Sequence, residues 1–295
     1  MALAGASMGT TWSARLALPP GVTRQQAQAA IAAALDEVVA QMSTWEAGSD
    51  ISRFNRAATG WQALPEALFH VLSHALDLAD ASGGAYDPTI GALVDAWGFG
   101  AGPRVHEPPA AAAIAAALAD CGHGRVRLDL SSIAKGYGVD RAALALRALG
   151  VTACLVEVGG ELRAHGVRPD GLPWRVAVEV PDASGAHALA VPLRDQSIAT
   201  SGDYRRYIEQ AGRRYAHTLA PRTGKPLDND LASVTVIHPE CMLADGLATA
   251  LGVLGAAAGA DYAARHDLAA LFILRGAAGH EVRATPAFAA LLDRP

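Results

Sequence analysis

The sequence has few cysteines, with three among 295 residues. Cys121, Cys154 and Cys241 are odd in number and far apart, which excludes a disulfide framework and matches no zinc-binding spacing. We interpret them as buried thiols. An excess of positive charge is also missing, because the formal net charge is −5. A general nucleic-acid-binding surface is therefore not expected.

The sequence also lacks an export signal. The first residues, MALAGASMGTTW, contain neither a basic segment nor the apolar core of a signal peptide. No apolar run approaches the length needed to cross a bilayer, so no membrane span is predicted. These absences predict a cytoplasmic location for the chain as given, and a periplasmic location if a leader has been removed.

Apolar residues are plentiful, at 51%, and their periodicity predicts both helices and strands. Thr23 and Gln26 form a capping-box pattern before a helix whose apolar stripe is Ile31, Leu35, Val38 and Met42. A second helix is predicted from about residue 65 to 81, with inward-facing Leu68, Val71, Leu72, Ala75 and Leu76. Further helices are predicted at 108–120 and 242–255, and strands at 9–18, 153–158, 174–180, 188–193, 232–237 and 271–275. Helices and strands do not alternate strictly, which favours an α+β fold.

Asp245 and Thr249 are four residues apart in a predicted buried helix, so they share one face. A buried carboxylate must be paired, hydrogen-bonded or bound to a metal ion. One carboxylate, one hydroxyl and nearby carbonyls suit a hard cation such as Mg²⁺, with substrate phosphates completing the coordination. The spacing by itself favours a simpler alternative, an aspartate that caps or pairs within the core.

The segment LDLSSIAKGYGVD, residues 128–140, is typical of a strand that runs into a helix. Ser131 and Ser132 are candidate helix caps, and the free N–H groups of the helix start attract an anion. Lys135 would lie in the first turn, where a cation opposes the helix dipole, and this placement favours a bound anion beside it. The alternative is a solvent-exposed lysine. A Walker P-loop is excluded because its pattern is absent.

Basic residues gather in RRYAHTLAPRTGKPL, residues 213–227. The cations are Arg213, Arg214, Arg222 and Lys225. His217 lies among them and is a candidate proton acceptor, although a lone histidine between strand-like residues is more often structural. The cations could equally form a solvated face. Taken with the metal site and the helix start, they predict a ligand that contains phosphate.

Eight segments, in order, resemble the ApbE-like family of flavin transferases (FAD:protein FMN transferases). They extend from residue 8 to about residue 255. The segments are MGTTW, MSTWEAGSDISRFN, YDPTIGALVDAWGFG, LDLSSIAKGYGVD, VEVGGELRAHG, SIATSGDYRRY, AHTLAPRTGKPL and ADGLATALGVLG. A collinear set of this kind is far more specific than any one motif.

The resemblance implies a single α+β domain of the T-fold-like flavin-transferase type over residues 1–295. It implies FAD as the donor substrate and Mg²⁺ as the cofactor. Family members transfer the FMN half of FAD to a Thr or Ser hydroxyl of an acceptor protein and release AMP. The expected acceptor carries a D-x-x-[ST]-G-A-[ST] motif in a redox-complex subunit or domain. A Mg²⁺-dependent FAD pyrophosphatase and an FAD-binding protein without turnover are the alternatives.

The resemblance also implies roles for individual residues. The metal ion would be held by Asp245 and Thr249, with the carbonyls of Ser132 and Ala248 nearby. Contacts to the flavin and the adenine would come from Met8, Trp45, Asn55, Ala85, Tyr86, Asp87, Asp129, Lys135 and Leu219. The implied catalytic residues are His217, which accepts the proton of the acceptor hydroxyl, Lys135, which offsets charge on the pyrophosphate, and Arg222, which steadies the leaving phosphate.

Two residues depart from the family pattern. Ala220 stands where an aspartate usually precedes the proline of the PRTG turn, and Glu157 occupies a strand position where asparagine is usual. A carboxylate that orients a catalytic histidine can change the rate by orders of magnitude. Ala220 therefore bears on the rate of transfer more than on FAD binding.

Overall fold

The structure, a computed structural model, describes residues 1–102, 105, 107–121, 125–179, 188–202, 207–210, 213–276 and 279–292, with backbone alone at 188, 207–210, 213 and 214. Its main sheet has eight strands in the order β1-β2-β3-β4-β7-β12-β13-β14. Neighbouring strands all run antiparallel. The strands are β1 (Ala2–Ser7), β2 (Thr10–Leu16), β3 (Cys154–Val158), β4 (Glu161–His165), β7 (Ser197–Gly202), β12 (Leu231–His238), β13 (Ala269–Gly276) and β14 (Gly279–Ala284). Antiparallel strands with separately packed helices confirm the α+β prediction.

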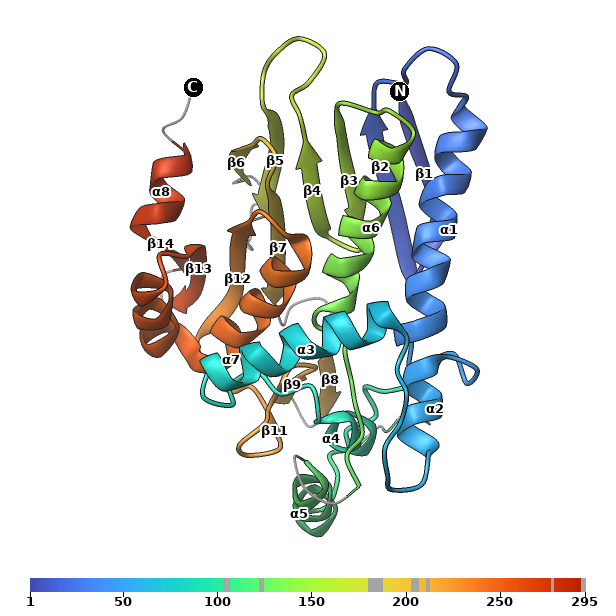
Figure 1. Cartoon of the computed structure of the whole chain (residues 1–295). Helices are drawn as coiled ribbons and strands as arrows, with labels where there is room; N and C mark the ends of the chain where they lie inside the picture. The colour runs from blue at the N-terminus through green and yellow to red at the C-terminus, as the bar shows by residue number, and fades with distance from the viewer. Residues whose placement is uncertain are drawn as a thin grey trace.

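Three helices, α1 (Arg24–Met42), α6 (Ala134–Ala148) and α7 (Cys241–Arg265), lie side by side over one face of the sheet (Figure 1). The predicted capping box at Thr23 and Gln26 is present at the start of α1. All four residues of its predicted apolar stripe are buried. They pack with the inward side chains of the sheet, so burial of this apolar face holds the helix in place.

Helix α3 (Glu66–Ala81) crosses the lower ends of these helices (Figure 1). The predicted inward face is confirmed at Leu68, Val71 and Ala75, but Leu76 is 46% exposed and Leu78 is buried instead. Positions 68, 71, 72, 75 and 76 also have helical spacing, but the buried face is centred on Val71, Ala75 and Leu78, so Leu76 lies outside it. The helix ends before Gly83 and Gly84, which adopt φ angles of 61° and 78° that favour glycine.

The opposite face of the sheet is covered by a hairpin and a short helix. The hairpin joins β5 (Trp174–Glu179) to β6 (Ala188–Leu193), and the helix is α8 (Pro286–Leu292). Trp174, Val176 and Val178 are buried there, as their alternation predicts, while Val180 lies outside the described residues. These side chains form a separate apolar core with Phe288 of α8.

The smaller elements gather at one end of the sheet (Figure 1). They are α2 (Asp50–Arg56), α4 (Gly91–Ala96), α5 (Ala111–Asp120), and the hairpins β8 (Tyr207–Gln210)–β9 (Arg213–Ala216) and β10 (Leu219–Ala220)–β11 (Lys225–Pro226). Leu93 of α4 and Trp97, which caps the end of α4, pack with Ile114 of α5 and with Leu219, forming a small core of their own. This core ties the 219–226 hairpin to α4.

Helix α7 corrects the prediction that no apolar run is long enough to cross a bilayer. It has 25 residues and is apolar enough by composition, but 56% of its most apolar window is buried inside the protein, as in a core helix. The sequence reading ended the helix at Gly255, where the structure shows a kink with φ 79° and a helix that continues beyond it. Length alone is therefore weak support for a membrane span here.

Candidate active site

The start of α6 packs against α7, and this contact brings Asp245 to the first turn of α6. Asp245 is 6% exposed, and its Oδ2 atom accepts a hydrogen bond from the N–H of Gly136 at 3.0 Å. Only glycine fits at 136, because a Cβ atom there would lie 2.3 Å from the carbonyl oxygen of Cys241. Thr249 lies one turn further along α7 on the same side. The predicted pair is therefore on one helix face, beside the start of α6.

Lys135 stands between two carboxylates. Its ammonium group forms an ion pair with Oε1 of Glu161 and lies 3.9 Å from Oδ1 of Asp245. Burial by itself would lower the pKa of Lys135, but the charges of Asp245 and Glu161 raise it above its ordinary value. Burial raises the pKa of Asp245, against the effects of Lys135 and the Gly136 N–H. The lysine is charged and held in place, so the alternative of a freely solvated lysine is wrong.

Glu161 is the residue of this cluster that sequence reasoning missed. It is the first residue of β4 and is 3% exposed. The Gly159–Gly160 turn places it there, with φ angles of 63° and 111° at the two glycines. Its only signal in the sequence is an acidic residue directly after a glycine pair that reverses the chain.

The segment that leads into α6 is a turn, and its serines do not cap the helix. The cap position is Ile133, which makes no side-chain capping bond, and the helix starts at Ala134. The predicted caps are therefore wrong, because the N–H groups of Ile133 and Ala134 already bond to the carbonyl of Leu130. Ser132 instead donates its hydroxyl to the Tyr86 hydroxyl at 3.1 Å, and so connects two predicted site residues.

Asn55 and Asp87 hold the neighbouring backbone. The Asn55 amide donates to the carbonyl of Leu128 at 2.9 Å and accepts from the N–H of Leu128 at 2.7 Å, as a strand neighbour would. Asp87 accepts hydrogen bonds from the N–H and the hydroxyl of Thr89. Asp129 accepts from the Ser131 N–H at 2.8 Å, and burial raises its pKa. These bonds set the shape of the segments around Tyr86 and Ser132.

The remaining predicted contact residues are apolar, and their exposure differs widely. Met8 occupies the β1–β2 turn with φ 52°, and its Sδ atom lies close to Gly138 of α6. Trp45 is 61% exposed and available as a stacking surface. Three of the predicted residues, Ala85, Leu219 and Ala248, are buried.

His217 follows β9 and lies beside Phe99, which comes just after the end of α4. The ring of Phe99 meets the ring of His217 edge-on, with centroids 6.5 Å apart. Arg222 is exposed and donates to the carbonyl of Gly83 at 2.7 Å, which connects its loop to the glycine turn before Tyr86. The side chains of Arg213 and Arg214 lie outside the described residues.

Backbone bonds and a tryptophan hold the turn at Ala220. The carbonyl of Ala220 accepts from the N–H groups of Thr223 at 3.1 Å and Gly224 at 2.9 Å. The indole N–H of Trp97 donates to the carbonyl of Gly224 at 2.7 Å. The turn is therefore formed without the carboxylate that the family pattern usually places at 220.

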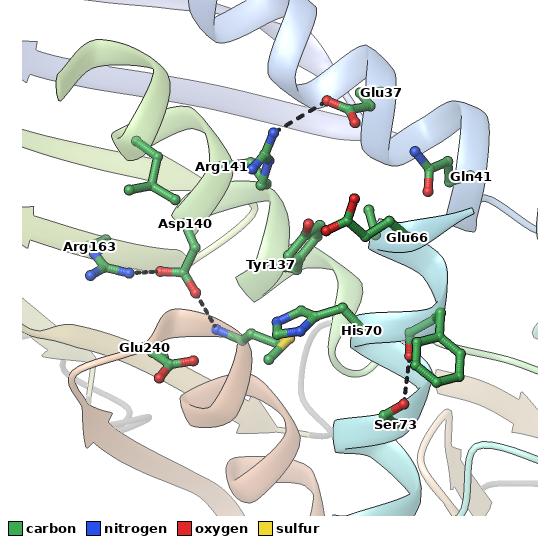
Figure 2. A pocket seen from close by; sticks show the side chains of 14 residues that line it. Glu37, Gln41, Glu66, His70, Ser73, Tyr137, Asp140, Arg141, Arg163 and Glu240 are labelled. Carbon is green, nitrogen blue, oxygen red and sulfur yellow. Dashed lines mark hydrogen bonds and ion pairs between the residues drawn. The ribbon is translucent and has the colours of Figure 1, made fainter. Parts of the chain in front are cut away.

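A separate cavity of about 790 Å³ lies between α1, α3, α6 and the start of α7 (Figure 2). Arg163 pairs there with Asp140, whose carboxylate accepts from the N–H groups of Cys241 at 3.1 Å and Met242 at 2.9 Å. These bonds satisfy the N-terminus of α7 and give Asp140 a structural role. None of the predicted site residues lines this cavity.

Comparisons with known proteins agree with the resemblance seen in the sequence. The pattern of the ApbE family matches residues 8–272. The FAD:protein FMN transferase of Vibrio cholerae serotype O1 is 37% identical over 99% of this chain and 92% of its own length, and that of Haemophilus influenzae is 36% identical over 99% and 92%. The solved flavin transferase ApbE from Vibrio cholerae has a TM-score of 0.91 at 36% identity and covers 99% of this chain and 98% of that chain. The apo flavinyl transferase ApbE of Pseudomonas stutzeri has a TM-score of 0.90 at 38% identity, with 100% and 97% covered.

This fold is that of a flavin transferase, and the protein is an enzyme. The chain belongs to the ApbE family, and the predicted resemblance is confirmed.

Proposed function

We propose that this enzyme transfers the FMN moiety of FAD to a Thr or Ser hydroxyl of an acceptor protein and releases AMP. The observation that supports this most directly is the position of Lys135, which stands 3.9 Å from Asp245 at the start of a helix. A held cation at a helix N-terminus suits a pyrophosphate. FAD contains a pyrophosphate, and the curated relatives are named for its use as donor.

The residues around Asp245 fit Mg²⁺. Asp245, the Thr249 hydroxyl and the carbonyls of Ser132 and Ala248 would hold it, and all of these ligands are the hard oxygen atoms that Mg²⁺ prefers. Within the described part of the chain, no group of three or more His, Cys, Asp or Glu side chains is placed to hold a metal ion. Substrate phosphate oxygens would therefore complete the site. When bound, Mg²⁺ would offset negative charge that develops on the pyrophosphate.

The protein's own groups would carry the remaining steps. The acceptor hydroxyl oxygen forms a bond to the FMN phosphorus, the bond from that phosphorus to the AMP phosphate oxygen breaks, and AMP leaves. His217 takes the hydroxyl proton, directly or through water. Lys135 stabilises the negative charge on the bridging phosphates, and Arg222 stabilises the negative charge on the AMP phosphate. Arg222 donates a hydrogen bond to the Gly83 turn, so the loop that carries Arg222 and the Gly83 turn would contact the same ligand.

The proposed contacts to FAD come from both exposed and buried residues. Trp45 would stack on an aromatic ring of the nucleotide, since most of its surface is open to solvent. Asn55 would act through the backbone of Leu128, which it already holds. The other proposed contacts are Met8, Ala85, Tyr86, Asp87, Asp129 and Leu219. The proposed acceptor carries D-x-x-[ST]-G-A-[ST] in a redox-complex subunit or domain.

One incubation tests the proposal. The protein is mixed with FAD, Mg²⁺ and a peptide that carries the D-x-x-[ST]-G-A-[ST] motif, and the products are resolved by mass spectrometry. We expect FMN bound covalently to the peptide hydroxyl, with AMP released in equal amount. A peptide with alanine in place of the acceptor Thr or Ser is the control and should stay unmodified. Free FMN with AMP would indicate hydrolysis, and unchanged FAD would indicate binding without turnover; either result contradicts the proposal.

A second experiment tests the departure at Ala220. We expect Ala220→Asp to change the transfer rate by less than about threefold, because backbone bonds and Trp97 already form the turn. Steady-state transfer to the same peptide measures it, with FAD affinity measured separately. A rate increase of about tenfold or more would show instead that the missing carboxylate limits the enzyme.

A further inference from the structure

Only one of the two carboxylate oxygens of Glu161 has a partner among the described residues. Glu161 is 3% exposed, and its Oε1 atom carries the ion pair with Lys135. Its Oε2 atom is buried and has no hydrogen-bond partner among the described residues. A buried acceptor left without a partner destabilises a protein, so such an atom calls for an explanation. The neighbouring Glu157 shows the contrast, because its two oxygens accept from Gly160 and Ser13.

Oε2 of Glu161 lies where two hairpin turns meet. A Cβ atom placed on Gly159 would be 3.5 Å from this oxygen and 2.9 Å from the methyl group of Thr10. Thr10 directly follows the Met8–Gly9 turn, and Gly159 opens the turn into β4. The N–H of Gly159 also bonds to the carbonyl of Thr11, so the two turns are held together. The oxygen therefore borders both the Lys135 cluster and the turn that carries Met8.

Oε2 of Glu161 is a carboxylate oxygen, which limits the groups that can bind to it. A carboxylate oxygen repels phosphate and accepts hydrogen bonds, so its partner must be an uncharged or cationic donor. Lys135 already supplies the cation on the other oxygen. A flavin nucleotide offers sugar hydroxyls on either side of its pyrophosphate, and a hydrogen bond from a hydroxyl to a charged acceptor is among the stronger ones.

We propose that Glu161 is a substrate-binding residue, in which Oε1 holds Lys135 and Oε2 accepts a hydrogen bond from a sugar hydroxyl of the nucleotide. This inference rests on the proposed function, since it takes FAD as the donor. The hydroxyl belongs either to the ribityl chain of the flavin half or to the ribose of the adenosine half. Glu161 thereby fixes the sugar chain relative to the pyrophosphate that Lys135 faces.

A binding cycle tests the contact. Equilibrium binding is measured by flavin fluorescence for FAD and for analogues that each lack one hydroxyl, on the ribityl chain or on the ribose. In the unchanged protein, loss of the partner hydroxyl should weaken binding by about 10- to 100-fold. In Glu161→Gln, loss of the same hydroxyl should weaken binding far less, because the charged acceptor is gone. The hydroxyl that shows this coupling identifies its half of FAD.

The control is Glu157→Gln, a matched substitution in the same hairpin whose oxygens are already satisfied. It should leave every hydroxyl effect unchanged. Circular dichroism checks folding, and Glu161→Asp, which keeps the charge but shortens its reach, replaces Glu161→Gln if that variant does not fold. FAD binding with equal hydroxyl effects in the unchanged and variant proteins would overturn this inference alone. Failure of the unchanged protein to bind FAD would overturn the proposed function and this inference with it.

Discussion

Replacing Asp245 with Asn should abolish Mg²⁺-dependent transfer, with a fall in rate of at least about a thousandfold. The amide keeps the size of the side chain and an oxygen that can accept from the Gly136 N–H. The substitution removes the negative charge that would bind the cation. In the unchanged protein this charge lies 3.9 Å from Lys135. Covalent FMN on the acceptor peptide, measured over a range of Mg²⁺ concentrations, gives the result.

A substitution on the same helix provides the control for Asp245. Asp261 is an exposed residue of α7, so Asp261→Asn makes the same chemical change away from the α6–α7 contact. That variant should keep full transfer and the same dependence on Mg²⁺. Full transfer by Asp245→Asn, with folding confirmed by its melting curve, would rule out the assignment of Asp245 to the metal ion.

Replacing His217 with Gln should lower kcat by about 100- to 10,000-fold, the range that a positioned general base contributes. FAD affinity should stay within about twofold, because the histidine acts on the acceptor rather than on the donor. Glutamine preserves hydrogen-bonding atoms near the edge of the Phe99 ring but does not accept a proton. Single-turnover transfer gives the rate, and flavin fluorescence gives the affinity.

His266 supplies the matched control for His217. It lies at the exposed end of α7 against Tyr262, and His266→Gln should leave transfer unaltered. Equal losses of kcat and of FAD affinity in His217→Gln would assign this residue to donor binding instead. A normal kcat would show that another group accepts the proton.

Local patterns predicted the parts of the fold that depend on near neighbours in the chain. The Thr23–Gln26 capping box, the α1 stripe and the alternating strand from Trp174 to Val178 all match the structure. Strand β1 was not predicted, because its small residues carry no clear alternation and its pairing with β2 decides its conformation. The serine caps failed for a similar reason, since the backbone of Leu130 satisfies the N–H groups that they were expected to bind.

For the site, the sequence alone determined the family, the Asp245–Thr249 pair on one helix face, and Lys135 in the first turn of a helix. Those features rest on collinear motifs and on the helical period, which nearby residues encode. Only the tertiary structure decided that Lys135 lies between Asp245 and Glu161, and that Trp97 supports the turn at Ala220. These contacts join residues far apart in the chain. Helix packing and strand register bring them together, and no spacing along the sequence specifies which distant carboxylate or carbonyl will be within reach.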